Sequence, residues 1–321
     1  MKRLAARSAL ACIALSASAA AVAQTWPDRA ISLVVPFAAG SGTDNVARQV
    51  GQKLAERLGQ PVVIENKPGA SAQIAAEFVA QAKPDGYTLF MTTNTSHSAN
   101  PSLFKNLRYD PIKDFTPVAR TGELPFALAV NPSLPVNSTK ELIDYAKANP
   151  GKISYATPNS TSLVASETIR MMAGIDIVGV QYKSSPQALT DLMGGQLQMY
   201  VVDFGSGLST LRTDKVRTLA VTPARGSKIL PDVPPIADAL PGFDLTSWNG
   251  VFGPAGLPKE IVERLHRELH AVLADPEVRD KLATVGFEVW PSESPDDFAS
   301  YVAEQLELWG RLIKQAGIEP R

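Results

Sequence analysis

The feature that most constrains the fold of this chain is a regular alternation of short apolar runs with longer amphipathic segments. The short runs are rich in Val, Ile and other strand-forming residues, and turn residues bound them. They predict strands at 31–35, 61–65, 88–92, 126–130, 153–156, 177–180, 198–202, 216–221 and 248–252. The segments between them repeat apolar residues at helical spacing and predict helices at 45–58, 72–80, 139–149, 162–173, 185–194, 259–274, 276–285 and 296–316. Strands that alternate with helices predict an α/β fold with parallel sheets and helices on both faces.

The first residues predict export from the cytoplasm. Three basic residues precede an apolar stretch, 9–20, that is too short to span a bilayer, and Ala-Val-Ala at 21–23 fits the small-x-small cleavage pattern. We therefore expect residues 1–23 to be a signal peptide cleaved near Ala23, and a periplasmic location for the remainder. The single cysteine, Cys12, lies in this segment, so we expect no disulfide and no cysteine metal site in the exported protein.

Charge and length narrow the function further. Removing the three basic residues of the leader leaves 28 Lys and Arg against 32 Asp and Glu, a net charge of −4. Nucleic-acid-binding surfaces need clustered Lys and Arg, whereas here charges of both signs alternate along the predicted helices, so no nucleic-acid partner is expected. The roughly 298 residues that remain exceed what one core usually holds and predict two domains.

A loop of small residues joins the first predicted strand to the first predicted helix. Residues 36–44 read Pro-Phe-Ala-Ala-Gly-Ser-Gly-Thr-Asp. The first N–H groups of a helix have no intrahelical partner and lie at the positive end of its dipole. Because Gly40 and Gly42 add no side chain, a carboxylate or phosphate can approach those groups, and the loop predicts an anion site. The alternative is an ordinary strand-to-helix turn in which Thr43 or Asp44 caps the helix.

A second loop of the same kind follows the predicted strand 153–156. Residues 157–162 read Thr-Pro-Asn-Ser-Thr-Ser and lead into a helix, so hydroxyl groups dominate the loop. As an alternative, Ser160 or Ser162 only caps that helix. Ligands of such sheets bind at the carboxyl ends of the strands. Two such loops in two domains would face each other across a cleft, which is the arrangement that a binding protein needs.

Short motifs spread over residues 26–318 carry a specific resemblance. They include Val-Val-Pro-Phe with Gly-Thr-Asp in the first loop, Glu-Asn-Lys-Pro-Gly-Ala at 65–70, Pro-Asp-Gly-Tyr-Thr-Leu at 84–89, Asn-Pro-Gly-Lys at 149–152, Leu-Pro-Asp-Val-Pro at 230–234 and Pro-Ala-Gly at 254–256. In this order they resemble the Bug family of periplasmic solute receptors, the extracytoplasmic receptors of tripartite tricarboxylate transporters. Each motif is weak alone, but their number and order make coincidence implausible.

The resemblance implies a two-lobed periplasmic binding protein, type II-like, with two doubly wound α/β domains joined by two crossing strands. The domains would be 24–125 plus 249–321 and 126–248, and the crossings would fall near 124–126 and 246–251. A small carboxylate would be enclosed between the lobes. Closure about two hinges is a common way to bury a ligand.

The resemblance also implies which residues bind the ligand. One wall would be formed by the first loop and the end of the strand 88–92, with Phe37, Ser41, Gly42, Thr43, Asp44, Thr93, Asn94 and Ser96. The opposite wall would be formed by the second loop and the residues after the strand 198–202, with Asn159, Ser160, Thr161, Ser162, Asp203 and Phe204. In the family, backbone N–H groups and bridging waters hold the carboxylate, which agrees with the anion site predicted for the first loop.

Departures from the family pattern bear on the identity of the ligand. Ser41 stands among residues that are usually glycines, Leu163 or Val164 stands where members often carry a histidine, and Ser184 replaces a usual glycine. A more apolar second wall suits a carboxylate with a sizeable apolar body. We therefore predict an aromatic or longer aliphatic mono- or dicarboxylate, terephthalate-like compounds included.

Other chemistries have weaker support in the sequence. His266 and His270 have the i, i+4 spacing of metal ligands, but the glutamate of a zinc-protease motif is misplaced and no third ligand is evident, so no metal is expected. The first loop lacks the lysine of a nucleotide-binding loop, and no cofactor is expected. A serine hydrolase needs a Gly-x-Ser-x-Gly elbow, which Gly-Ser-Gly at 205–207 is not. Asp44 and Asp203 would form a carboxylate pair only if they faced each other.

The sequence thus predicts a monomeric receptor that has no chemistry of its own. Its partners would be a small carboxylate and the permease subunits of a tripartite tricarboxylate-type transporter. One alternative is a periplasmic sensor that signals to a membrane partner. The less favoured alternative is a carboxylate-processing hydrolase, which catalytic turnover of the bound ligand would distinguish from a receptor.

Overall fold

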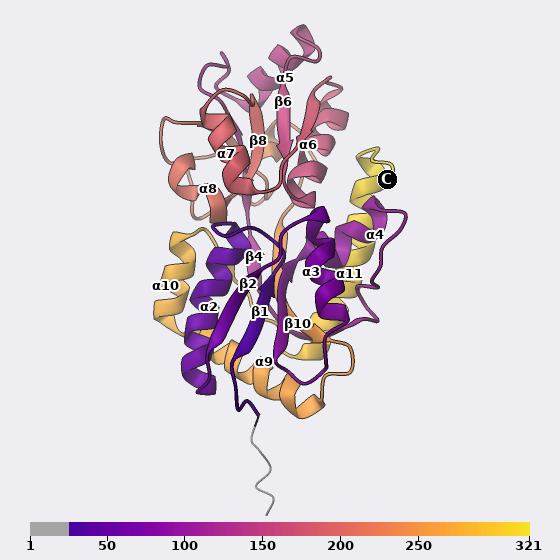
Figure 1. Cartoon of the computed structure of the whole chain (residues 1–321). Coiled ribbons are helices and arrows are strands. Elements are labelled where there is room, and N and C mark those ends of the chain that lie inside the picture. Colours follow the sequence, from indigo (N-terminus) through magenta and orange to yellow (C-terminus); the bar gives the residue numbers. More distant parts are fainter. Residues whose placement is uncertain (1–25) are drawn as a thin grey trace, which may run out of the picture.

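The chain folds into two lobes, which Figure 1 shows one above the other. The computed structural model describes residues 26–321, so the predicted signal peptide lies outside the described residues. Each lobe contains one sheet flanked by helices, and the chain passes between the lobes through neighbouring strands. The predicted two-lobed α/β architecture is confirmed. No helix between residues 26 and 321 combines the length and apolar character that a membrane span requires.

Lobe 1 contains a six-stranded sheet in the order β11-β4-β10-β3-β1-β2. Its strands are β1 (Ile31–Val35), β2 (Val62–Asn66), β3 (Thr88–Thr93), β4 (Phe115–Leu124), β10 (Ser247–Pro254) and β11 (Glu288–Val289). Its helices are α2 (Gly42–Leu58), α3 (Gln73–Ala80), α4 (Asn100–Leu103), α9 (Lys259–Ala274), α10 (Pro276–Thr284) and α11 (Pro295–Gln315). Two short turns, η1 (Ala70–Ala72) and the π-helical η2 (Thr95–Ala99), precede α3 and α4.

Lobe 2 contains a five-stranded sheet in the order β7-β6-β8-β5-β9. Its strands are β5 (Phe126–Val130), β6 (Ser154–Thr157), β7 (Val178–Gln181), β8 (Met199–Asp203) and β9 (Arg217–Val221). Its helices are α5 (Thr139–Ala148), α6 (Ser160–Ala173), α7 (Ser185–Met193) and α8 (Phe204–Leu211), and a short turn, η3 (Ile236–Asp238), follows β9.

Both sheets are mixed, so the prediction of parallel sheets was wrong in part. In lobe 1, β1 runs parallel to β2 and β3, whereas β10 runs antiparallel to both β3 and β4. In lobe 2, β6 is parallel to β7 and β8, but β5 is antiparallel to β8 and β9. The antiparallel pairs arise where the chain crosses between lobes, because β4 leaves lobe 1 and β10 returns to it beside β4.

The two crossings lie side by side. The first passes from β4 through Pro125 into β5, and the second enters β10 at Ser247. Ser247 is the strand partner of Leu124, so the last paired residues before the crossing are direct neighbours. Pro125 lacks an N–H group and cannot continue the β4 ladder. The chain therefore crosses between the lobes in a narrow pair of strands, which can act as a hinge.

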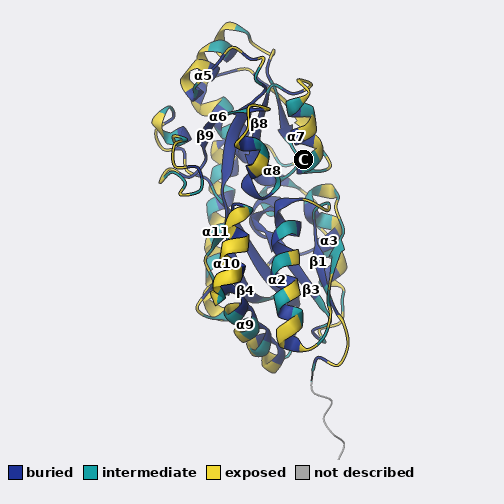
Figure 2. Cartoon of the chain, turned by 90° about the vertical axis from the view of Figure 1, so that its left-hand side faces the viewer, coloured by how far each residue is buried: buried dark blue, intermediate teal, exposed yellow. Residues whose placement is uncertain are grey.

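Both lobes bury the central strands of their sheets, whereas the edge strand β7 is exposed, and the other exposed residues are concentrated on the outer faces of the helices (Figure 2). The last helix, α11, takes part in the core of both lobes. Phe298, near its start, packs with Trp248 and Phe252 of lobe 1. Trp309 and Ile313, near its end, belong to the apolar cluster built on the sheet of lobe 2.

The buried turn η2 carries a histidine, His97. Its ring stacks on Phe252 with the centroids 4.0 Å apart and lies 4.6 Å from the ring of Phe115. Nδ1 forms a hydrogen bond of 2.9 Å with the Ser96 hydroxyl, and Nε2 has no partner among the described residues. Burial lowers the pKa of His97 to about 3. The residue is part of the core rather than a ligand contact.

We expect His97 to make the protein sensitive to acid. Its pKa is about 6.5 in the unfolded chain and about 3 in the native state, so the unfolded state binds more protons between these values and stability falls as the pH drops from 6.5. At about 1.36 kcal/mol per pH unit, the free energy of unfolding should lose about 2 kcal/mol between pH 7 and pH 5 from this group alone. In His97→Phe, the free energy of unfolding measured with urea should not show this decrease between pH 7 and pH 5. His270→Gln, at an exposed position of α9, is the control, and identical pH slopes for His97→Phe and the wild type would contradict the prediction.

Candidate functional site

A cavity lies between the two lobes, where the loops after β1, β6, β7 and β8 converge. Its volume is about 30 Å³, which is room for a few water molecules, so a larger ligand requires the lobes to separate slightly. Its lining consists of Phe37, Ala38, Ser41, Gly42, Thr43, Thr93, Thr95, Leu124, Phe126, Pro158, Asn159, Thr161, Lys183, Ser184, Ser185, Asp203 and Ser247. Eight of the residues that we predicted for the site are in this lining: Phe37, Ser41, Gly42, Thr43, Thr93, Asn159, Thr161 and Asp203.

The loop after β1 directs the N-terminus of α2 at the cavity. Ser41 is the N-cap, and its hydroxyl accepts a hydrogen bond of 3.3 Å from the Asp44 N–H. The helix begins at Gly42, three residues earlier than predicted, because Ser41 rather than Thr43 or Asp44 caps it. Gly42 and Thr43 therefore lie in the first turn, where N–H groups have no intrahelical partner and the helix dipole favours an anion. The Gly42 N–H donates to the Ser206 hydroxyl of lobe 2, so the Thr43 N–H is the one that an anion can use.

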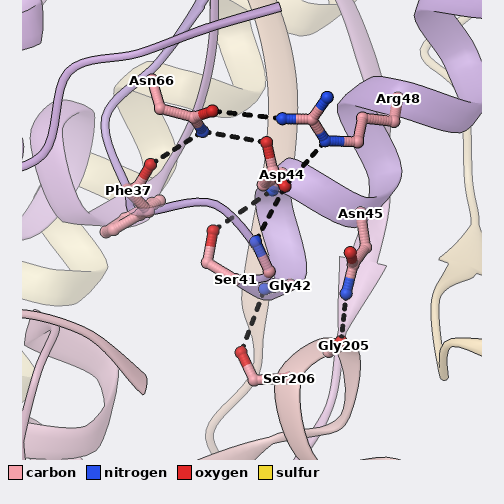
Figure 3. A network of polar contacts seen from close by, with 10 residues as sticks. Phe37, Ser41, Gly42, Asp44, Asn45, Arg48, Asn66, Gly205 and Ser206 are labelled. Atoms are coloured by element: carbon pink, nitrogen blue, oxygen red, sulfur yellow. Dashed lines mark hydrogen bonds and ion pairs between the residues drawn. The ribbon is translucent and has the colours of Figure 1, made fainter. Parts of the chain in front are cut away.

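Asp44 does not line the cavity; it holds the loop that does. The carboxylate accepts hydrogen bonds of 2.9 Å from the Gly40 N–H, from Nε of Arg48 and from Nδ2 of Asn66 (Figure 3). Nδ2 of Asn66 also donates to the carbonyl of Phe37 at 3.0 Å. Both ends of the loop are thus attached to one buried carboxylate.

These contacts keep the carboxyl group of Asp44 ionised. Burial raises the pKa of its carboxyl, but the hydrogen bonds from Arg48, Gly40 and Asn66 and the charge of Arg48 outweigh it, so the pKa lies below its ordinary value. A carboxylate that is ionised, buried and fully hydrogen-bonded fixes the surrounding backbone. Asp44 is therefore a supporting residue and not a ligand contact.

Threonine hydroxyls present hydrogen-bond donors to the cavity. Thr161 Oγ1 accepts a hydrogen bond of 3.0 Å from Nδ2 of Asn94, and Thr93 Oγ1 accepts one of 3.1 Å from the Thr95 N–H. Because protein donors already occupy an acceptor position on each oxygen, the hydroxyl hydrogens of Thr93 and Thr161 can turn toward a bound oxyanion. The chemistry of this wall suits a carboxylate.

Four of the predicted site residues lie one step behind the cavity wall. Asn94 and Ser160 join the lobes, since Asn94 donates to Thr161 and Ser160 donates to Thr95 at 2.9 Å. The Ser96 hydroxyl is bonded to Thr92 and His97, and the Ser162 hydroxyl donates to the carbonyl of Val201 at 2.8 Å. None of the four is in the lining of the cavity. The N-cap of α6 is Asn159, whose side chain accepts from the Ser162 N–H, so Ser160 and Ser162 do not cap that helix.

Asp203 and Phe204 belong to an unpredicted strand-to-helix junction rather than to a loop. Asp203 ends β8 and caps α8, and its Oδ1 accepts a hydrogen bond of 2.8 Å from the Ser206 N–H. Burial raises the pKa of Asp203 despite this bond. Phe204 is fully buried against Gly286 and does not line the cavity. The carboxylate of Asp44 accepts hydrogen bonds within lobe 1 and that of Asp203 caps α8 in lobe 2, so the two do not form a catalytic carboxylate pair.

The two lobes touch directly beside the cavity, through the first turns of α2 and α8. A Cβ atom added to Gly205 would lie 2.4 Å from the Cα of Gly42. Around this contact the Gly42 N–H donates to the Ser206 hydroxyl at 3.0 Å, and Nδ2 of Asn45 donates to the Gly205 carbonyl at 2.8 Å (Figure 3). We call Gly42, Asn45, Gly205 and Ser206 the closure contact. The structure therefore shows the closed arrangement of the lobes.

The apolar part of the cavity differs from the prediction. Leu163 packs at the edge of the lobe 2 core and Val164 is fully buried, so neither forms an apolar wall for the ligand. The apolar surface instead comes from residues of the first loop, the crossing and the second loop, namely Phe37, Ala38, Leu124, Phe126 and Pro158. Sequence reasoning noted Ser184 only as a departure from the family pattern, and it missed Thr95, Lys183, Ser185 and Ser247 as residues of the site. Ser184 and Ser185 could have been predicted, because they follow the end of the predicted strand 177–180. Ligands of such sheets bind at the carboxyl ends of the strands.

The histidine pair does not form a metal site. His266 uses both ring nitrogens in the protein: Nδ1 lies 3.0 Å from the Val118 carbonyl oxygen and Nε2 3.3 Å from that of Glu293. Within residues 26–321, no group of three or more His, Cys, Asp or Glu side chains is arranged to hold a metal ion.

Two α/β lobes, a two-strand connection and a cavity between the lobes that is lined with hydrogen-bond donors define the chain as a two-lobed solute-binding receptor of the periplasmic binding protein class. Residues 46–318 match the family model of the tripartite tricarboxylate transporter family receptor. The chain belongs to this family, which includes the Bug proteins, and the resemblance drawn from the sequence is confirmed.

Individual relatives support the assignment. A UPF0065 protein of Bordetella bronchiseptica is 38% identical over 303 residues, which cover 94% of this chain and 90% of that protein. Among solved structures, Rpa4515 of R. palustris with adipate is 36% identical with a TM-score of 0.89, covering 92% of this chain and 100% of that one. The periplasmic binding protein BugD is 33% identical with a TM-score of 0.87, covering 92% and 100%. The family is described as a transporter receptor and BugD as a periplasmic binding protein, so the chain is a solute-binding receptor and not an enzyme, as the sequence predicted.

Proposed function

We propose that this protein is a periplasmic receptor that encloses a small organic carboxylate with an apolar body and delivers it to the permease of a tripartite tricarboxylate-type transporter. The observation that carries the proposal is the lining of the cavity. One end offers the N-terminus of α2 and the hydroxyls of Thr43, Thr93 and Thr161, and Phe37, Ala38, Leu124, Phe126 and Pro158 form an apolar part. A carboxylate matches the first part and a hydrocarbon body matches the second.

The relatives and the two-lobed architecture support a periplasmic location and a role in carboxylate transport. One related structure is named as a periplasmic binding protein and another as holding adipate, a small carboxylate. We propose the same setting for this chain, with export directed by residues 1–23 and action as a monomer. The permease would contact the outer faces of both lobes in the closed state, because only closure fixes the orientation of one lobe relative to the other.

A ligand screen tests the proposal. The mature chain, freed of carried-over ligand by unfolding and refolding, should show a raised melting temperature with at least one of a set of aliphatic and aromatic carboxylates, because a ligand that binds only the folded state stabilises it. Adipate, hexanoate, terephthalate, benzoate and citrate form the set. No shift with any carboxylate, while amino acids or sugars raise the melting temperature, would overturn the proposal.

Within this proposal we expect Thr161→Val to weaken carboxylate binding. The variant keeps the shape of the side chain but removes one hydroxyl donor and the acceptor of the hydrogen bond from Asn94, which together should raise the Kd for adipate about 10-fold in calorimetry. Thr190→Val, on the exposed face of α7 in the same lobe, is the control and should leave the Kd unchanged. An unaltered Kd for Thr161→Val would show that this hydroxyl does not contact the carboxylate.

A further inference from the structure

The cavity between the lobes leads outward to a larger hollow at the mouth of the cleft. This mouth has a volume of about 690 Å³ and is lined by Pro36, Phe37, Ala38, Pro68, Gly69, Ala70, Ser71, Ala72, Pro158, Gln181, Tyr182, Lys183 and Ser184. Phe37, Ala38, Pro158, Lys183 and Ser184 line both spaces. These shared residues mark the passage through which the outer end of a bound ligand would point.

Lys183 is the one basic side chain in either lining among the described residues. The ion pairs formed within lobe 2 use other residues: Arg170 pairs with Glu167, and Lys140 pairs with Asp144. Asp191, on α7, accepts a hydrogen bond of 2.8 Å from the hydroxyl of Tyr182. Within residues 26–321 no carboxylate forms an ion pair with Lys183, so its positive charge is available at the passage.

The segment that carries Lys183 is held on both sides. Tyr182 is tied to α7 through Asp191, and Ser184 caps α7 by accepting from the Gln187 N–H at 3.4 Å. Across the cleft, the position of a Cβ on Gly40 lies 3.9 Å from Pro186, so the segment also meets the loop after β1. Lys183 is therefore presented at the cleft by an ordered segment when the lobes are closed.

We propose that Lys183 binds the second carboxylate of a dicarboxylate ligand at the mouth end of the cavity. The inner carboxylate lies against the threonine hydroxyls and the N-terminus of α2, the hydrocarbon body passes Phe37 and Pro158, and the outer carboxylate pairs with the ammonium group. This inference rests on the proposed function and narrows it to dicarboxylates. A monocarboxylate of the same length would place an uncharged end beside Lys183 and leave the ammonium group unpaired.

Calorimetry with matched pairs of ligands tests the role of Lys183. Adipate and hexanoate have the same chain length and differ in one carboxylate, and terephthalate and benzoate form an aromatic pair. For the wild type we expect the dicarboxylate of at least one pair to bind more tightly than its partner. In Lys183→Gln its Kd should rise about 10- to 100-fold, as expected for the loss of a charge-assisted hydrogen bond, while the Kd of the monocarboxylate changes less than about 3-fold.

Two further variants make the test specific. Lys183→Arg keeps the charge and should retain most of the preference for the dicarboxylate. Lys152→Gln removes an exposed lysine just before β6, at the end of that strand away from the cleft, and should bind as the wild type does. Equal losses for both members of a pair, or no loss, would overturn the role of Lys183 and leave the proposed function standing. A wild type that binds no carboxylate would instead overturn the proposed function.

Discussion

Gly205→Ala should abolish tight ligand binding without unfolding the protein. The new methyl group would lie 2.4 Å from the Cα of Gly42 on the other lobe, and no side-chain rotation can relieve a clash with backbone. The lobes would have to stay apart, so only a small fraction of molecules could reach the closed state, and the apparent affinity falls with that fraction. We expect the Kd for adipate to rise about 100-fold, in line with the cost of overpacking a tight contact.

Controls separate closure from folding. Alanine is a better helix former than glycine, and Gly205 lies in the first turn of α8, so the melting temperature of ligand-free Gly205→Ala should stay close to that of the wild type. Small-angle scattering should show that adipate compacts the wild type but not the variant. Gly310→Ala, within α11, places its methyl group no closer than 3.3 Å to the flexible Ser102 hydroxyl and should bind normally. Wild-type affinity in Gly205→Ala would show that the closure contact does not form around the ligand.

Asp44→Asn should reduce both stability and binding. An amide at this position offers one acceptor oxygen, and its NH₂ group would face groups that are themselves donors: the Gly40 N–H, Arg48 and Asn66. The loss of hydrogen bonds to a buried charge should lower the free energy of unfolding by about 2–3 kcal/mol. Because the loop after β1 would lose its fixed shape, we also expect the Kd for adipate to rise at least about 10-fold.

The pH dependence of this difference identifies its origin. The native pKa of Asp44 lies below its ordinary value of 3.8, so its stabilisation is fully present above that value and is lost as the pH falls through the lowered native pKa. The gap in unfolding free energy between wild type and Asp44→Asn should therefore be constant from pH 7 to about pH 5 and shrink below pH 4. His97 titrates in both proteins and cancels from the comparison. A gap that does not narrow in acid would mean that packing, not the carboxylate charge, accounts for the loss.

The sequence predicted the elements with a clear period and missed those without one. The strands 31–35 and 126–130 and the helix 259–274 were predicted to the residue, because alternating or continuous apolar residues mark them. β4 was missed: it contains Pro117, Arg120 and Gly122, and its pairing with β10 compensates for poor strand propensity. α8 was missed because glycines occupy its first turns, although Asp203 caps it.

For the site, sequence reasoning found the loops but not the function of each side chain within them. Ser41, Thr43 and Thr161 line the cavity, whereas Asp44, Ser162 and Phe204 face the protein interior. Which side of a loop a residue faces depends on contacts with distant segments, such as Asn66 for Asp44 and Gly286 for Phe204. The sequence around each residue does not indicate those contacts. The contribution of Lys183 and Ser247 depends on how the lobes meet, which no local pattern describes.

The position of α11 limits how the receptor can open. A rigid helix whose first half packs in the core of lobe 1 and whose last turns pack in that of lobe 2 cannot follow both lobes over a large separation. On opening, the lobes should therefore rotate about an axis near the end of α11. Residues near Trp309 would be displaced least, and the edge of the cleft around Gly40 and Pro186 would be displaced most. A pair of fluorophores would report ligand release only if attached at that edge, while a label near the C-terminus would stay almost still and give little signal.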